Sequence, residues 1–244
     1  MILFRVILLL FIFISPIKAN TIYYLIKIPN LEIYETNTKN NLRYFYATKP
    51  FQLSVEKNIK CKDSNKKTLD IKYKTVKKNL DLYSKNFLKK VNLKYIVLCE
   101  NLSISGILTA GIPDHIMKTL IIDLKFNEKH FERVIHHEVF HIINDSFKDI
   151  FDKDEWVNFN EKNFSYTACS TCSNKTGLMT YKEFNGFFTE YSKSTASEDM
   201  AEVFSYIIFN KEIVKKKIIN DPILKKKVNF IKNNILKIVE NFEF

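Results

Sequence analysis

Two histidines with a glutamate between them form the most informative pattern in this sequence. The segment 135–141 reads Ile-His-His-Glu-Val-Phe-His and contains His137-Glu138-x-x-His141. Residues four apart lie on one face of a helix, so both imidazoles can reach one metal ion. Glu138 lies beside them, where it can accept a proton from a water that the ion activates. Because the chain has only 5 histidines, chance should produce this pattern at roughly the one-per-cent level. A metal site is therefore favoured over a helix with surface histidines.

Zinc suits this pattern, because it binds imidazole and because a catalytic site with three protein ligands keeps one position open. The third ligand must lie elsewhere in the chain. A histidine at the spacing His-Glu-x-x-His-x-x-Gly-x-x-His is absent, since Asn144 and Phe147 occupy the glycine and histidine positions. His136 adjoins the pattern but points about 100° away from His137 on a helix. Packing, or a hydrogen bond to a ligand, is its expected role.

The segment 197–204 offers the best third ligand. It reads Ser-Glu-Asp-Met-Ala-Glu-Val-Phe and places Glu198 and Glu202 on one helical face. We expect Glu198 to bind the metal and Glu202 to accept a hydrogen bond from a ligand imidazole, which would fix the tautomer. Asp199 is the alternative ligand, although it lies off this face. Thr195-x-x-Glu198 can also be interpreted as a capping box only.

Segments 134–145 and 186–204 together resemble the gluzincin zinc metallopeptidases. The nearest likeness is to the branch of anthrax lethal factor and Pro-Pro endopeptidase, and to the bacterial proteins described as "putative zinc-binding metallopeptidases". In that branch a tyrosine seven residues before the third ligand stabilises the tetrahedral intermediate, and Tyr191 stands at this spacing before Glu198. A glutamate four residues after the ligand is also typical of the branch and matches Glu202.

The resemblance implies a zinc-dependent endopeptidase that acts on a peptide or protein substrate. Glu138 would serve as general base, and the hydroxyl of Tyr191 would donate to the developing oxyanion. With 12 tyrosines in the chain, a core position for Tyr191 is the alternative. The substrate is expected to lie extended along an edge strand, for which 104–109 is the candidate. The resemblance covers roughly residues 100–210. This sequence departs from the family at Phe140, where relatives often carry glycine.

Two other functions stay open on these residues. The first is a catalytically inactive, metallopeptidase-like binding protein, which the presence of Glu138 disfavours because an inactive descendant could lose this residue and keep zinc. The second is a zinc hydrolase of a non-peptide substrate, because the metal pattern alone does not specify the bond that is cleaved.

The N-terminus is typical of a signal peptide. Arg5 precedes an unbroken apolar run over residues 6–14, and the small residue Ala19 stands before the expected cleavage site. A membrane-spanning helix needs roughly 20 apolar residues, so this shorter run predicts a signal peptide over residues 1–19. We therefore expect a secreted or periplasmic protein, with an uncleaved N-terminal anchor as the alternative.

The formal net charge of +11 is concentrated in part in the lysine runs 215–217 and 225–227. No aromatic-and-basic recognition motif accompanies these runs, so nucleic acid is not an expected partner. A solvated helix face explains them, and an anionic surface bound by the basic C-terminal helices is the alternative. The sequence does not indicate an oligomeric state.

Four cysteines follow the expected signal peptide: Cys61, Cys99, Cys169 and Cys172. An even number in an exported chain favours disulfides, with three possible pairings. Cys169-Ser-Thr-Cys172 could be a local disulfide, a redox pair or half of a metal site. Because no second C-x-x-C completes a zinc site, a disulfide or free thiols in a loop are expected. This pair is not a known feature of the resembling family, which leaves the loop's structure and the substrate preference open.

Apolar runs predict strands early in the chain and helices late. Strands are expected at 22–28, 31–34, 42–48, 51–55, 94–99 and 119–124. Helical spacing is expected at 69–91, at 128–144 after an N-cap at Asn127, from 197, and from 221, where Asp221 would cap a helix that Pro222 begins.

This order indicates an α+β domain, in which a small N-terminal mixed sheet packs on the HExxH helix and a mainly helical C-terminal subdomain follows. A single domain over 20–244 is expected. Within it, 20–100 would be accessory strands and a helix, 101–210 the catalytic core, and 211–244 the C-terminal helices.

Overall fold

The computed structural model describes residues 21–183 and 185–244, so the expected signal peptide lies outside the described residues. The first half contains α2 (Thr21–Ile26), β1 (Leu31–Glu35), β2 (Arg43–Ala47), β3 (Phe51–Leu53), β4 (Ile59–Lys62), α3 (Lys66–Leu80), α4 (Lys85–Lys90), β5 (Tyr95–Ile104), β6 (Ile107–Leu108), β7 (Gly111–Asp114) and β8 (Thr119–Asp123). The second half contains α5 (Phe131–Ser146), α6 (Lys153–Val157), η1 (Ser170–Cys172), η2 (Tyr191–Lys193), α7 (Ala196–Phe209), α8 (Lys211–Asn220) and α9 (Pro222–Ile238).

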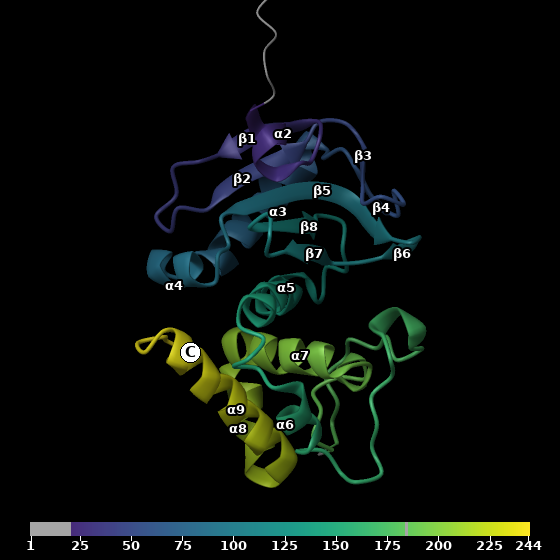
Figure 1. Cartoon of the computed structure of the whole chain (residues 1–244), viewed down its shortest axis with the longest axis vertical. Coiled ribbons are helices and arrows are strands. Elements are labelled where there is room, and N and C mark those ends of the chain that lie inside the picture. The colour runs from purple at the N-terminus through teal and green to yellow at the C-terminus, as the bar shows by residue number, and fades with distance from the viewer. Residues whose placement is uncertain (1–20, 184) are drawn as a thin grey trace, which may run out of the picture.

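The elements form layers that follow one another in roughly the same order as in the chain. The sheet lies at one end of the molecule, α5 crosses its middle, and α7, α8 and α9 form the other end (Figure 1). The prediction of an α+β fold, with a mixed N-terminal sheet and a helical C-terminal part, is confirmed.

The long strand β5 organises the sheet. Its first half pairs in parallel with β2 and β8, and its second half pairs antiparallel with β4 and β6. β1 and β7 are antiparallel partners of β2 and β8, respectively. The side chains of β5 alternate between the two faces, as a pleated strand requires. Ile96 and Leu98 therefore enter the large core beneath the sheet, whereas Val97 and Cys99 enter a smaller core on the other face.

The large core holds the helices against the sheet. It includes apolar side chains from α3, α5, α7 and α9, among them Val76, Val139, Phe204 and Ile231, none of which is measurably exposed. Burying such side chains stabilises each of them by about 1.5–3 kcal/mol relative to exposure. This packing holds α5 against both the sheet and α7, and so positions the residues that α5 and α7 carry.

Both disulfides occur, in one of the three pairings that were open. Cys61 on β4 is bonded to Cys99 on β5 within the smaller core, and Cys169 is bonded to Cys172 in the loop after α6. Free thiols at the C-x-x-C sequence are therefore excluded. Among the described residues, no helix is both long enough and apolar enough to cross a membrane.

Three predicted elements differ from the structure. The strand expected at 22–28 is wrong, because residues 21–26 form α2, which packs its buried Ile26 against the smaller core. The helix expected over 69–91 is two helices, because Ser84 caps a new helix by accepting the backbone N–H of Phe87 at 3.2 Å. Apolar residues at helical spacing continue through this break, so periodicity could not reveal it.

The start of α5 also differs from the expectation. Its N-cap is His130, which makes no side-chain capping bond. Asn127 lies in the preceding turn, where its side chain accepts the N–H of Lys129 at 3.1 Å. The expected N-cap Asp221 is confirmed, since its side chain accepts the N–H of Leu224 at 2.9 Å at the start of α9.

Candidate metal centre

Three donor atoms from α5 and α7 converge on one point. Nε2 of His137 lies 3.1 Å from Nε2 of His141, one turn later on α5. Oε2 of Glu198 lies 2.9 Å from the first nitrogen and 3.2 Å from the second. Among the described residues, this is the single group of histidine, cysteine or acidic side chains close enough to hold a metal ion.

The donor set and its spacing fit zinc. In a tetrahedral zinc site with bonds of about 2.0–2.1 Å, two ligand atoms lie roughly 3.3 Å apart. The three separations of 2.9–3.2 Å are close to this value. Two imidazoles and one carboxylate are also a common ligand set of catalytic zinc.

Helix α7 positions Glu198 in its first turn. Thr195 is the N-cap, and its hydroxyl accepts the backbone N–H of Glu198 at 3.2 Å. The capping contact and the metal-facing carboxylate therefore coexist, because the cap uses the backbone of Glu198 and leaves its side chain free to reach α5.

Glu202, one turn further along α7, holds His137 in orientation. Nδ1–H of His137 donates to Oε1 of Glu202 at 2.9 Å, which leaves the lone pair of Nε2 directed at the other two donor atoms. Arg133 donates through Nη1 to the same Oε1, and the hydroxyl of Thr189 donates to Oε2 at 2.7 Å. Burial tends to raise the pKa of Glu202, but the charges and hydrogen bonds of Arg133 and His137 together outweigh it, and the pKa falls to about 2. Glu202 therefore stays an acceptor.

Glu138 lies directly beneath β7. A Cβ placed on Gly111 would come within 2.8 Å of Cγ of Glu138 and 2.9 Å of the carbonyl oxygen of Ile121. Glycine is required here for space alone, because the close approach of strand and helix leaves no room for a methyl group. Burial, which is opposed by His137 and His141, raises the pKa of Glu138 to about 7. The raised pKa indicates a carboxylate that is largely withdrawn from water.

Tyr191 begins η2, and its ring lies 5.8 Å from the ring of His137. Its backbone N–H donates to the carbonyl of Gly177 at 3.0 Å, and Glu190 accepts the N–H of Gly177 at 2.9 Å. Burial first, and then the negative charges of Glu198 and Glu138, raise the pKa of Tyr191 above its usual range. The phenol is therefore protonated at neutral pH and can donate a hydrogen bond.

Two residues that the sequence left as alternatives point away from this centre. Asp199 is fully buried on the far side of α7, where its Oδ2 lies 2.7 Å from Nζ of Lys227 and accepts hydrogen bonds from Trp156 and Tyr166. It is part of a structural ion pair.

His136 is also buried on the opposite side of its helix. Tyr83 donates its hydroxyl to Nδ1 of His136 at 2.7 Å, and Nε2–H donates to Oδ1 of Asn79 at 3.0 Å. Burial lowers the pKa of His136 to about 3. The expectation that His136 packs in the core is confirmed, and the alternative of a bond to a metal ligand is wrong.

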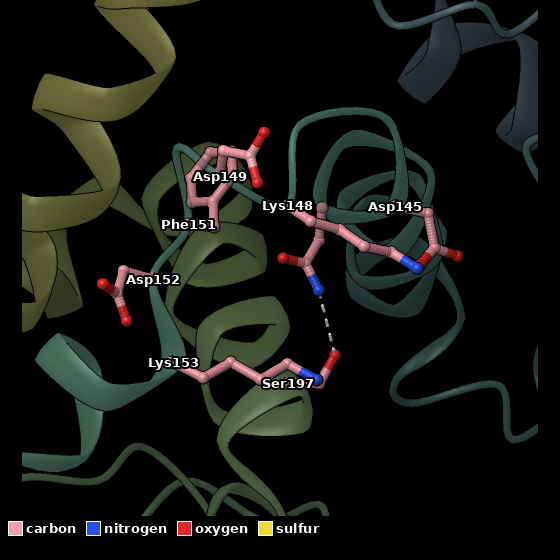
Figure 2. A pocket seen from close by; sticks show the side chains of 8 residues that line it. Asp145, Lys148, Asp149, Phe151, Asp152, Lys153 and Ser197 are labelled. Carbon is pink, nitrogen blue, oxygen red and sulfur yellow. Dashed lines mark hydrogen bonds and ion pairs between the residues drawn. The ribbon is translucent and has the colours of Figure 1, made fainter.

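A cavity of about 560 Å³ adjoins the metal centre at the C-terminal end of α5. Ser197 lines it, and Oγ of Ser197 lies 3.5 Å from Nδ1 of His141. Figure 2 shows Asp145 and Lys148 on one wall, with the Lys148 side chain extending toward Asp145, and Lys153 on the opposite side. The lining is polar and carries charges of both signs, so the cavity suits a polar side chain or a hydrated segment of a ligand.

Sequence reasoning missed Arg133, Gly111 and Gly177. Arg133 stands four residues before His137, so helical spacing could have placed it on the same face. Gly111 carries no local signal except that the chain has only 4 glycines. Gly177 acts through its backbone, and the sequence has no pattern that would reveal it.

Comparison with protein families agrees with this geometry. The family model described as "Putative zinc-binding metallo-peptidase" matches residues 17–240, which is nearly the whole chain. Neither the curated proteins nor the solved structures gave a match. Because the family match spans the convergent His137, His141 and Glu198, this chain belongs to that family of zinc metallopeptidases, which are hydrolases that act on peptide or protein substrates.

Proposed function

We propose that this protein is an exported zinc-dependent endopeptidase in which His137, His141 and Glu198 bind the metal. The observation that carries the proposal is the convergence of these three donor atoms beside Glu138, a buried carboxylate. A structural zinc site has no need of such a carboxylate, because four protein ligands close it. Three ligands with an adjacent base fit catalysis.

When bound, zinc supplies a Lewis acid that lowers the pKa of a water and polarises the carbonyl of the substrate. Glu138 accepts the proton of the attacking water and then delivers it to the departing amine. Tyr191 donates its phenolic hydrogen to the carbonyl oxygen as negative charge develops there. Glu202 keeps the Nδ1 proton on His137, so that Nε2 of this imidazole stays available to the metal.

Strand β7 is the element that best fits an extended substrate. Among the described residues it pairs on one side only, with β8, and it passes over Glu138 at Gly111. A peptide could therefore add to its free edge through main-chain hydrogen bonds. The sequence pointed instead to 104–109, but there β6 is a two-residue strand that folds back on β5. The cavity beside Ser197 would receive side chains from one end of the peptide.

Export is supported by the N-terminal sequence and by the two disulfides. Disulfides persist in oxidising compartments and are rare in reducing ones. Both cysteines of the Cys61–Cys99 bond are buried in the smaller core, so this bond is part of the folded interior. We therefore propose a secreted or periplasmic location, with the segment 1–19 as signal peptide, and a mature unit over 20–244.

A digest of a diverse peptide library tests the activity. We expect internal cleavage that stops when a chelator removes zinc and returns when zinc is restored. Glu138→Gln is the matched variant, because it keeps the shape of the side chain and should bind zinc normally. Its cleavage rate should fall by about 10²–10⁴. A wild-type protein that holds zinc and cleaves no peptide would contradict the proposal and favour an inactive binding protein or a hydrolase of another bond.

A further inference from the structure

A second cavity, of about 400 Å³, lies at the beginning of the parallel strands β2, β5 and β8, next to α4. None of the residues proposed above for metal binding or catalysis lines it. Its lining includes five basic residues: Arg43, Lys85, Lys89, Lys94 and Lys118. None of the described residues that line it is acidic. The lining of the cavity therefore concentrates positive charge.

Strand pairing places three of these cations side by side. The N–H of Arg43 donates to the carbonyl of Lys94 at 3.0 Å, and the N–H of Lys94 donates to the carbonyl of Lys118 at 2.9 Å. Neighbouring strands lie about 4.8 Å apart. The three side chains therefore start from adjacent strand ends, and all three line the same cavity.

Helix α4 adds two more cations from the neighbouring wall. Lys85 and Lys89 are exposed and one turn apart, an arrangement in which like charges destabilise a helix. In the described chain, none of the five cations forms an ion pair with an acidic side chain. A bound anion would relieve the repulsion among them.

The remaining walls favour an organic ligand over a bare ion. Leu88 and Leu93 line the cavity but are only 1 % and 4 % exposed, so its apolar surface comes mainly from the hydrocarbon stems of the lysine side chains. The exposed amides of Asn41 and Asn92 supply hydrogen-bond donors. Asn41, Asn92 and Lys118 have φ values of 66°, 63° and 57°. Asparagine tolerates this left-handed conformation, whereas lysine adopts it rarely. Strained backbone of this kind gathers at ligand sites.

We propose that this cavity binds a polyanion that carries at least two phosphate or sulfate groups on an organic body. The volume lies within the range of small-molecule sites. Lysine and arginine bind tetrahedral oxyanions through charge-assisted hydrogen bonds, and the hydrocarbon stems of the lysine side chains contact the body of the ligand. The ligand is either a free small molecule or a segment of a longer chain, because both present the same groups. This site is separate from the proposed peptidase centre and does not depend on it.

Calorimetric titration of the zinc-loaded protein tests the proposal, with two probes. One is fructose 1,6-bisphosphate, and the other is a fully sulfated heparin-type hexasaccharide, compared with its desulfated form. The cavity variant is Lys85→Gln/Lys89→Gln/Lys118→Asn, in which asparagine suits the positive φ at position 118. Loss of these contacts should weaken binding at least about tenfold. The matched control Lys216→Gln/Lys225→Gln/Lys226→Gln removes the same charge from exposed positions on α8 and α9. It should stay within about threefold of wild type.

The outcomes separate the two sources of the ligand. Binding of the bisphosphate supports a free small anion, whereas binding of the sulfated hexasaccharide alone supports an anionic chain. The proposal is overturned if neither probe binds, if the desulfated sugar binds equally well, or if both variants weaken binding to the same extent. The last result would assign binding to net charge alone. Unchanged peptide cleavage and unfolding temperature of the cavity variant show that it is folded.

Discussion

Arg133 and His137 donate hydrogen bonds to the same oxygen atom, Oε1 of Glu202. All three side chains are buried, with exposed fractions of 0–4 %. The carboxylate of Glu202 is thus held by the permanent positive charge of Arg133, which lies one helical turn before His137. Glu202 in turn orients the imidazole of His137. A tautomer held in this way resists loss of the Nδ1 proton, which keeps Nε2 of His137 free to bind zinc.

The ligand set itself gives the first prediction. Glu198→Ala should lose tightly bound zinc, because two imidazoles alone do not complete the site. Asp199→Asn should retain one zinc per chain, since Asp199 faces Lys227 on the other side of α7. Zinc content after dialysis against a weak chelator measures both variants. The reverse pattern, with zinc lost from the Asp199 variant alone, would show that the wrong carboxylate has been assigned.

Arg133 should control zinc affinity through Glu202. We expect Arg133→Lys to weaken zinc binding by about 10–100-fold, the usual effect of losing a partner of a ligand imidazole. Competition with a chelator well below the unfolding temperature measures the change. Ser205→Ala is the control, because it removes a weaker 3.3 Å bond to Arg133 and leaves Glu202 in place. If both variants bind zinc as the wild type does, Arg133 is a packing residue only.

Gly111 should be required for catalysis and not for zinc binding. In Gly111→Ala the new methyl group meets Cγ of Glu138 and the backbone of Ile121, so the carboxylate is displaced. We expect kcat to fall by about tenfold to a hundredfold, because misplacing a reacting group by about 1 Å has effects of this order. Gly106→Asn is the control, because position 106 has open space and a positive φ that asparagine tolerates. If kcat is unchanged in the Gly111 variant, the strand has moved to make room for the methyl group and the Glu138 carboxylate has kept its position.

Tyr191→Phe tests the proposed oxyanion donor. The ring and its packing remain, so zinc content, unfolding temperature and KM should be nearly unchanged. The hydroxyl acts only as charge develops on the carbonyl oxygen, so kcat should fall by roughly tenfold to a thousandfold. Tyr181→Phe, in a partly exposed tyrosine of the same loop region, provides the comparison. A destabilised variant with normal kcat per folded molecule would make Tyr191 a core residue.

The two disulfides should have different consequences when removed. The Cys169–Cys172 bond lies in the segment that leads to Gly177, whose carbonyl accepts the N–H of Tyr191. Cys169→Ser/Cys172→Ser should therefore lower kcat by about threefold to tenfold, on the scale of a loosened donor, with little change in unfolding temperature.

Cys61→Ser/Cys99→Ser is the matched comparison for that variant. This bond joins two buried cysteines that lie 38 residues apart in the chain, so its loss should reduce the free energy of unfolding by about 2–5 kcal/mol. The kcat of the remaining folded protein should be normal. Steady-state kinetics and chemical denaturation of both variants measure the contrast. If both disulfide variants change kcat to the same extent, the C-x-x-C loop does not position Tyr191.

The sequence by itself determined the parts of the site that depend on helical spacing. His137 and His141 lie on one face of α5 because residues four apart on a helix share a face, and Glu138 follows His137 directly in the chain. The same spacing related Glu198 to Glu202 on α7. The mixed α+β class also followed, because apolar runs and helical periodicity occupy different halves of the chain.

Only the tertiary structure decided what happens where separate elements meet. The sequence left Asp199 open as a ligand, and the packing of α9 against α7 turned it to Lys227 instead. It placed a strand at 22–28, although residues 21–26 form a helix that packs Ile26 against the smaller core. The contact of Gly111 with Glu138, the Cys61–Cys99 disulfide and the hydrogen bond of Arg133 to Glu202 each join residues far apart in the chain. Such contacts depend on how the elements pack, and local propensity and periodicity carry no information about distances between elements.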